Sequence, residues 1–436
     1  LKLCALKLAV LRWQPQKGAH LSPLAQAMRN KASLAAGTYA SLPQELPEPV
    51  DEEKGGEKRP AQASPSKGWR GELSALRTFL CHPMYLLLLA IPFALRARDL
   101  GLHSVQVFFL NFIAILPLAN VNAAAIEAFT VHSGPIVGGM IEGFFGKVVE
   151  QIMAVQCMKA GLVEVLQGNL MGSLHWNLLL VLGMAIFLAG VLRSEKEQSF
   201  NENGAAAQMS CQVVASISIV LPTMYRNISG TNADDVLWLS RICSFCIMMV
   251  YLLFLFFHFR THAMLFSDTK DDDNPTPAKE RLSFGSAFFL MILSAFIVWH
   301  CSALVVESIP NVSDHFGIPK AFIGCTLLPI IGNTADHIAA VGAAMQGKMD
   351  LAICVAVGSA TQIALFVVPG AVLWGWVFNE QMSLNFRNFD ATVMMLSTLL
   401  CSQVLQHGNS NWLHGAMLMT TYTLIAVISW FIPERY

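Results

Sequence analysis

From Phe79 onward, long hydrophobic stretches alternate with short polar breaks along the chain. Each stretch has about 20 residues, which is the length of an α-helix that crosses the hydrocarbon core of a bilayer. The stretches lie at approximately 78–96, 103–129, 135–159, 162–192, 208–226, 235–259, 283–308, 319–346, 350–378, 389–406 and 411–432. The pattern predicts an all-α polytopic membrane protein with about 11 transmembrane helices.

The composition is typical of the same class of protein. Hydrophobic residues make up 54% of the 436 residues and charged residues only 13%, whereas soluble domains carry about 25% charged residues. We therefore expect a lipid bilayer around the chain, and a net charge of -1 without a basic stripe predicts no nucleic-acid partner. The sequence has no nucleophile–base pair, phosphate-binding loop or cofactor motif, so we expect neither an enzyme nor a bound cofactor.

Two segments differ in composition from the hydrophobic stretches. Residues 12–70 are rich in Pro, Ala, Glu, Lys and Gly, and we expect the whole of 1–77 to form a disordered cytosolic tail. The segment 267–282 contains three consecutive aspartates followed by two prolines, which predicts an acidic cytosolic loop. This loop divides the hydrophobic part of the chain in two.

The two parts share a repeated pattern. A shift of 186 positions places Gly332 on Gly146 and Asp336 on Glu150, and it also aligns further glycines and alanines of the same stretches. One constant shift that aligns two acids and their small neighbours indicates an internal duplication.

The duplication predicts how the hydrophobic stretches are organised. The repeated acids lie in the third and the eighth stretch, and an odd number of crossings between two copies reverses the direction of the second copy in the membrane. We therefore predict one extra helix at 78–102, a first five-helix repeat at 103–266 and an inverted second repeat at 283–436. Inverted repeats commonly meet at a substrate site near the bilayer midplane.

Polar residues inside the hydrophobic stretches are the candidates for such a site. Acids at membrane depth are costly and usually functional, whereas amides and hydroxyls also serve as contacts between helices. The candidate ligands of a cation or proton are Glu150, Asp336, Asn333, Ser173, Asn177, Ser359 and Gln362. Six to eight oxygen ligands suit Ca²⁺, and two adjacent carboxylates also compete for protons. Glu150 and Asp336 are therefore predicted as the shared metal and proton ligands of a cation/proton antiporter.

Two neighbouring residues extend this hypothesis. Pro329 lies four residues before Asn333, so the helix over 319–346 should kink or unwind just ahead of the site. His337 directly follows Asp336 and is a candidate proton relay.

These motifs resemble a known family. The segments 322–329, 332–337 and 358–369 resemble the second signature repeat of the CAX-type cation/proton exchangers, and 138–150 and 172–183 resemble the first. These exchangers are vacuolar calcium/proton antiporters of the calcium/cation antiporter superfamily. The resemblance implies a sodium/calcium-exchanger-like helix bundle. It also implies that the chain moves cytosolic Ca²⁺ into a vacuole or another acidic organelle in exchange for protons. A homo-oligomeric assembly is left open.

The first repeat departs from the family pattern. The family usually has Gly-Asn-Ala-Thr-Glu where this chain has Gly146-Lys-Val-Val-Glu150, so Lys147 replaces an asparagine. Glu142 stands where an asparagine is common, and Trp176 stands where a small hydroxyl residue is usual. In the second repeat, Asp336 replaces the usual glutamate. These departures make Lys147 and Glu142 candidate modifiers of ion selectivity.

The position of the Lys147 side chain decides how strongly it acts. An ammonium about 5 Å from a bound cation costs about 3 kcal/mol per unit charge at an effective dielectric constant near 20. Alternatively, Lys147 pairs with Glu142 or Glu150, and we favour Glu142 because these two unusual residues occur together. Two alternatives to calcium/proton exchange follow from the divergent repeat: exchange of Mn²⁺, another metal or a monovalent cation, or a non-transporting regulatory paralogue.

Overall fold

The computed structural model describes residues 83–193, 196–228, 230–263 and 282–432. The predicted tail at 1–77 lies outside these residues, as does all but the last residue of the predicted acidic loop at 267–282. Those two assignments stay predictions.

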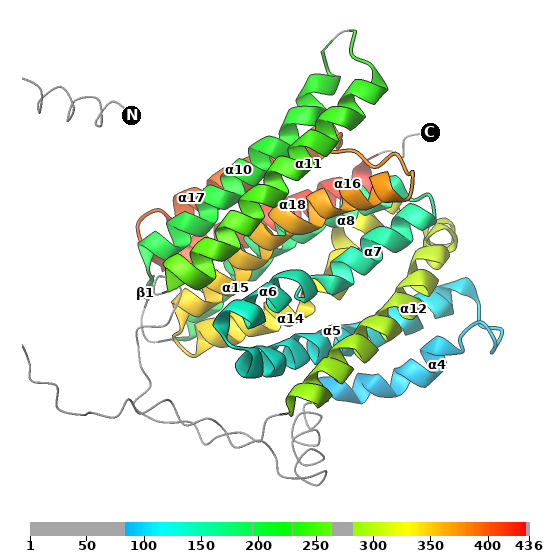
Figure 1. The fold of residues 1–436 in the computed structure, drawn as a ribbon, viewed down its shortest axis with the longest axis horizontal. Coiled ribbons are helices and arrows are strands. Elements are labelled where there is room, and N and C mark those ends of the chain that lie inside the picture. Colours follow the sequence, from blue (N-terminus) through cyan, green and yellow to red (C-terminus); the bar gives the residue numbers. More distant parts are fainter. Residues whose placement is uncertain (1–82, 194–195, 229, 264–281, 433–436) are drawn as a thin grey trace, which may run out of the picture. The chain divides into compact units, whose positions relative to one another are not determined.

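Eleven helical segments make up most of the described residues, in agreement with the predicted number of helices (Figure 1). Some of them consist of two or three consecutive helices. The first half contains η1 (Pro83–Ala90) with α4 (Ile91–Leu95), α5 (Ser104–Ser133), α6 (Pro135–Phe145) with α7 (Val148–Lys159), α8 (Val163–His175) with η2 (Trp176–Val181) and α9 (Leu182–Leu192), α10 (Glu202–Arg226), and α11 (Ala233–Phe256) with η3 (Phe257–Thr261). The second half contains α12 (Phe284–Phe316), α13 (Lys320–Phe322) with η5 (Ile323–Leu327) and α14 (Leu328–Met345), α15 (Met349–Gln362) with η6 (Ile363–Val367) and α16 (Val368–Val377), α17 (Asn388–Leu405), and α18 (Trp412–Phe431).

The helices differ in their ability to cross a membrane alone. Among the described residues, seven continuous helices are long and apolar enough to do so. The segment over 135–159 falls short because it is broken into α6 and α7, and α14 carries the polar residues of the candidate site. Of the predicted extra helix at 78–102, residues 83–102 are described, and the helical part runs from Pro83 to Leu95. The assignment of an extra helix outside the two repeats stays a prediction.

The duplication is visible in the helix boundaries. The helices α8, α9 and α10 begin 186 residues before α15, α16 and α17, respectively. The turn before α8 and the turn before α15 each contain a glycine with positive φ, Gly161 at 70° and Gly347 at 83°. A residue with a Cβ is strained in this conformation. Both halves therefore enter the corresponding helix through the same type of turn.

Corresponding helices of the two repeats pack against each other. In Figure 1, α5 lies beside α12 on one side of the bundle and α10 lies beside α17 on the other, and both pairs are in contact. The helices α6, α7, α14 and α15 lie between these pairs (Figure 1). The acid-bearing helices α7 and α14 belong to the third and eighth segments, as expected for inverted repeats.

A short β-ribbon was not predicted. Strand β1 (Glu197–Ser199) pairs antiparallel with β2 (Asn409–Asn411), with Gln198 opposite Ser410. The ribbon joins the segment after α9 to the start of α18. The sequence does not indicate it because both strands are three-residue polar segments without the alternation of apolar and polar residues typical of strands.

Two π-helical segments follow the candidate hydroxyl ligands. In the first repeat, η2 begins three residues after Ser173, and in the second, η6 begins four residues after Ser359. A π-turn widens the helix, and such turns occur frequently at functional sites. The two repeats therefore carry the same irregularity at equivalent positions.

Small residues allow helices of the two repeats to approach closely. A Cβ atom on Gly172 of α8 would lie 2.1 Å from the backbone oxygen of Cys325 in η5, and one on Gly324 would lie 2.7 Å from the oxygen of Val165. Such contacts are compatible only with glycine. This close approach brings the start of α14 against α8 and fixes the polar residues of both helices at one depth.

Candidate cation-binding site

The first repeat contributes its acid at a break in the helix. Helix α6 ends at Phe145 and α7 begins at Val148, and the backbone of Lys147 is non-helical, with φ −117° and ψ 28°. Glu150 lies in the first turn of α7, where free backbone N–H groups and the helix dipole favour a negative charge. The break therefore supports the carboxylate of Glu150 and determines the direction in which the Lys147 side chain extends.

The ammonium group of Lys147 lies between the two acids. Its Nζ is 2.5 Å from Asp336 Oδ2, 3.2 Å from Glu150 Oε1 and 3.3 Å from Asn333 Oδ1. A lysine ammonium has three N–H donors and no acceptor. All three donors therefore have an oxygen partner, and the two repeats are joined through one cationic group.

This charged cluster is buried. The exposed fraction of the side chain is 2% for Lys147 and 4% for Glu150, but 27% for Asp336. Removing a charge from water costs several kcal/mol unless a partner compensates for it, and here each carboxylate has the same ammonium as its partner. Because Asp336 is partly exposed, we expect an ion to reach the cluster from the side on which Asp336 lies.

The favoured pairing of Lys147 with Glu142 is wrong. Glu142 is exposed near the end of α6, and the ion pairs of Lys147 are with Glu150 and Asp336. The alternative pairing with Glu150 is confirmed. The physical reason is the break at 146–147, which directs the lysine side chain toward α14 instead of back along α6.

Asn333 is the central neutral residue of the cluster. Its Nδ2 donates to Ser173 Oγ at 3.1 Å and to the backbone oxygen of Pro329 at 2.9 Å. Its Oδ1 accepts hydrogen bonds from Lys147 and, at 2.7 Å, from Asn177 Nδ2. The carboxamide is therefore fixed with its oxygen directed at the ammonium.

Two further polar residues complete the group. Ser359 donates a hydrogen bond of 2.8 Å to Asp336 Oδ2, which fixes that carboxylate. Asn177 is fully buried, and its Oδ1 has no hydrogen-bond partner among the described residues. A buried carbonyl oxygen without a partner is costly, and this one belongs to a residue hydrogen-bonded to Asn333. The structure thus brings together six of the seven predicted ligands.

The seventh, Gln362, contacts the backbone instead of the carboxylates. Its Nε2 donates to the backbone oxygens of Glu142 and Gly143 at 3.2 and 2.8 Å. Tyr251 donates to the same Gly143 oxygen at 2.8 Å. Both side chains therefore donate to the Gly143 oxygen near the end of α6, where the last carbonyl groups of a helix lack intrahelical partners. The Glu142 oxygen also accepts a 2.8 Å hydrogen bond from the backbone N–H of Gly146. Sequence reasoning missed Tyr251 because it lies in an ordinary apolar stretch.

His337 lies away from the two acids. Its Nε2 is 3.1 Å from the sulfur of Met184 in α9, and its ring centroid is 5.7 Å from that of Trp176. Among the described residues it makes no hydrogen bond to Asp336 or Glu150. Successive residues of an α-helix point about 100° apart, which explains why the neighbour of Asp336 faces another helix. The role of His337 as a proton relay therefore stays a prediction, with Met184 and Trp176 as its observed neighbours.

The predicted irregularity near Pro329 is a π-helical segment just before α14. Pro329 lies in the first turn of α14, where a missing N–H is tolerated, and the π-helical segment η5 directly precedes this helix. The helix over 320–345 is thus widened ahead of the site, while the equivalent segment of the first repeat is broken. The backbone oxygen of Pro329 accepts a hydrogen bond from Asn333.

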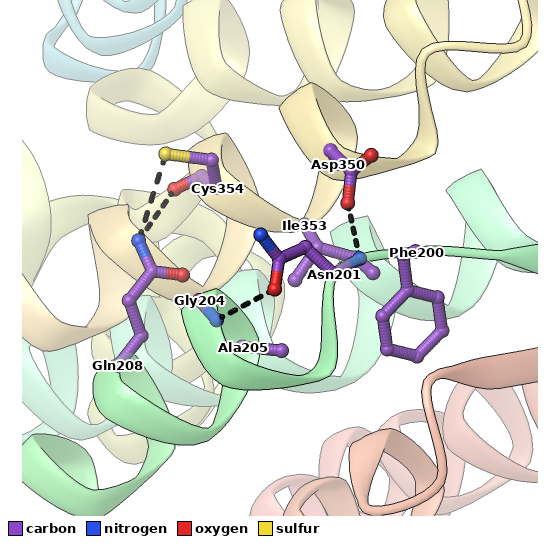
Figure 2. A pocket seen from close by; sticks show the side chains of 8 residues that line it. All are labelled: Phe200, Asn201, Gly204, Ala205, Gln208, Asp350, Ile353 and Cys354. Carbon is purple, nitrogen blue, oxygen red and sulfur yellow. Dashed lines mark hydrogen bonds between the residues drawn. The ribbon is translucent and has the colours of Figure 1, made fainter. Parts of the chain in front are cut away.

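A small pocket elsewhere in the bundle contains a single acid, in contrast to the two acids around Lys147 (Figure 2). It lies between the start of α10 and α15, and Asp350 accepts a 2.5 Å hydrogen bond from the backbone N–H of Asn201. Asp350 is the only acid that lines it. Across the described residues, no group of three or more His, Cys, Asp and Glu residues could hold a metal ion. The candidate cation site around Lys147 therefore consists of two acids, Glu150 and Asp336, with amide and hydroxyl groups beside them.

Several known proteins are similar in sequence to this chain. The family model described as sodium/calcium exchanger protein matches residues 103–260 and 286–431. The Ca(2+)/H(+) antiporter of Aphanothece halophytica is 35% identical over 80% of this chain and 96% of its own length. The vacuolar cation/proton exchanger 1a of Oryza sativa subsp. japonica is 34% identical over 80% and 79%. The vacuolar calcium ion transporter of Schizosaccharomyces pombe is 30% identical over 80% and 85%.

Solved structures share the fold. The structure of native YfkE, at 27% identity, superposes with a TM-score of 0.69 over 80% of this chain and all of that chain. The H+/Ca2+ exchanger CAX, at 11% identity, has a TM-score of 0.64 over 84% and 89% and supports the fold alone. The chain therefore belongs to the sodium/calcium exchanger protein family, among the relatives of the CAX-type cation/proton exchangers.

Proposed function

We propose that this protein is a secondary active transporter that exchanges a divalent cation, Ca²⁺ in the first place, for protons. The observation that carries the proposal is the convergence of two acids from equivalent positions of the two repeats. Glu150 and Asp336 each lie within ion-pair distance of one buried point, which the Lys147 ammonium occupies. A cation at that point interacts with both halves of the protein at once, as alternating access requires.

The oxygens around this point suit a hard cation. The two carboxylates offer four oxygens, and the side-chain oxygen of Asn333 adds a fifth. Ca²⁺ takes about six to eight oxygen ligands, and the Ser359 hydroxyl, 2.8 Å from Asp336 Oδ2, is the candidate for a sixth. Protons and Ca²⁺ compete for the same carboxylate oxygens, so binding one releases the other. The residues in these roles are Glu150 and Asp336 as shared ligands, with Asn333, Asn177 and the hydroxyls of Ser173 and Ser359 supporting them.

The direction and location of transport follow from the relatives. Proteins named vacuolar cation/proton exchanger and vacuolar calcium ion transporter are at least 30% identical to this chain over four fifths of its length. We infer that the protein is embedded in the membrane of a vacuole or another acidic organelle. There the outward proton gradient drives cytosolic Ca²⁺ into the lumen.

Transport by the purified protein in proteoliposomes tests the proposal. Vesicles with an acidic lumen should accumulate Ca²⁺ from a neutral medium when they contain the protein and lose this uptake when the proton gradient is dissipated. Asp336→Asn should abolish uptake because it removes one of the two charges that hold the cation. Asp350→Asn is the matched control, because it makes the same chemical change at the pocket of Figure 2 and asparagine can still accept the hydrogen bond from Asn201.

The outcomes separate the competing functions. Uptake of Ca²⁺ that Asp336→Asn abolishes and Asp350→Asn preserves supports calcium/proton exchange. Uptake of Mn²⁺ or a monovalent cation without Ca²⁺ uptake contradicts it in favour of altered selectivity. Absence of flux for every ion, in vesicles that contain folded protein, favours a non-transporting regulatory paralogue.

A further inference from the structure

The lysine in the cluster stands where the repeat symmetry calls for an amide. The shift of 186 residues that relates the repeats places Lys147 on Asn333, and these two side chains are in direct contact. A symmetric site would offer a second carboxamide oxygen at this position. The chain instead places a positive charge among the oxygens of the site.

The position of this charge coincides with the position of a bound cation. The Nζ atom lies 2.5–3.3 Å from oxygens of Asp336, Glu150 and Asn333. Ca²⁺ binds its oxygen ligands at about 2.3–2.6 Å. An ion coordinated by these oxygens and the ammonium group therefore exclude each other sterically, and their charges repel each other as well.

We propose that Lys147 is a resident internal cation that the transported ion must displace, so that this residue sets the affinity and the valence selectivity of the site. The inference rests on the proposed exchange at Glu150 and Asp336. With the ammonium in place, two carboxylates and one cation leave a single negative charge. A neutral amide at this position, as at Asn333 of the second repeat, would leave two.

The contacts of Lys147 indicate that displacement has a substantial cost. Its three donors are all paired with oxygens, two of them in carboxylates, and the side chain is 2% exposed. The coupling between close charge pairs at a buried interface can amount to about tenfold in affinity or more. A divalent ion that must break these contacts therefore binds at least about tenfold more weakly than it would without the lysine.

Three substitutions separate the contribution of the charge from that of the ligand atoms. Lys147→Met removes the charge and adds no oxygen, Lys147→Asn removes the charge and restores the symmetric amide, and Lys147→Arg keeps the charge. We expect the concentration of Ca²⁺ for half-maximal binding to fall at least about tenfold in the Met and Asn variants. The Arg variant should remain at the parental value or bind more weakly. Isothermal titration of the purified full chain with Ca²⁺ at one fixed pH measures these values.

A melting experiment keeps the test valid if a variant is less stable. Without Lys147, the buried Glu150 carboxylate and the partly exposed Asp336 carboxylate lose their common cationic partner, and the ion-free protein should melt at a lower temperature. Added Ca²⁺ should then raise the melting temperature of the Met variant more than that of the parent, because a ligand stabilises the folded state according to its affinity. Asp336→Asn combined with Lys147→Met should remove this effect.

The possible results distinguish this inference from the proposed function. If the parent takes up Ca²⁺ but the Met variant binds it with unchanged affinity, displacement is refuted and exchange stands. If the parent takes up no Ca²⁺ while the Asn variant does, displacement is supported and calcium exchange by the parent protein is refuted. If neither the parent nor any neutral variant binds Ca²⁺, both conclusions fail.

Discussion

Replacing Gly332 with alanine puts a methyl group against the carboxylate of Glu150. A Cβ atom built at this position of α14 would lie 2.8 Å from Glu150 Cδ, 2.9 Å from its Cγ and 3.0 Å from its Oε1. Glu150 Oε1 is also the atom that pairs with Lys147. The substitution therefore acts on the site without removing any of its polar groups.

The size of the effect follows from these distances. Non-bonded carbon atoms prefer separations of about 3.5–4.0 Å, so the Glu150 carboxylate must move by about 1 Å. A displacement of about 1 Å of a group that positions a substrate can cost about a hundredfold in rate. We expect the initial rate of Ca²⁺ uptake to fall about 10- to 100-fold. The fold should persist because the displaced atoms belong to the end of a flexible side chain.

The assay compares two alanine variants of the same helix. Gly342 also lies in α14, and a Cβ atom there would meet no atom within 4 Å. Both substitutions gain the same helix propensity, about 1 kcal/mol, so the difference between them isolates the contact with Glu150. Initial uptake rates in proteoliposomes and melting temperatures in detergent should be measured for both.

Either of two results would refute this reasoning. If Gly332→Ala and Gly342→Ala transport at equal rates and melt at equal temperatures, the Glu150 carboxylate does not need its position against Gly332. Equal losses of transport in both variants would also contradict it, because Gly342 contacts nothing at the site.

Two other predictions concern packing between helices. Gly172→Ala should destabilise the protein by about 3 kcal/mol or more, because its Cβ would lie 2.1 Å from the backbone oxygen of Cys325. The control is Gly285→Ala, whose Cβ would meet no atom within 4 Å. Equal melting temperatures of the two variants would contradict the predicted close packing. Tyr251→Phe should cost about 1 kcal/mol of stability, since it removes one hydrogen bond to the Gly143 oxygen. The rate of Ca²⁺ uptake should stay unchanged. A loss of uptake at unchanged stability would show instead that the hydroxyl acts in transport.

Much of the bundle could be predicted from local rules. The eleven helical segments follow from the length and hydropathy of the stretches, and the shift of 186 residues recurs in the helix boundaries. The β-ribbon was missed because hydrogen bonding between distant loops leaves no hydrophobic pattern. The predicted extra helix, tail and acidic loop lie partly or wholly outside the described residues.

The partners of individual side chains were less predictable. The sequence identified the acids Glu150 and Asp336 and the amide Asn333 because polar groups are rare inside apolar stretches. It assigned Lys147 to Glu142, although the same repeat shift that aligned the acids also aligned Lys147 with Asn333. That alignment was the available signal that the lysine lies inside the site.

The sequence by itself determined that the chain is a duplicated bundle of membrane helices with one acid of the candidate site in each repeat, because bilayer thickness and the cost of buried charge act on each segment separately. Only the tertiary structure decided which groups meet there. The direction of the Lys147 side chain depends on the dihedral angles at the break between α6 and α7, and its three oxygen partners come from both repeats. Contacts of this kind depend on how inverted helices pack, which no local pattern of residues encodes.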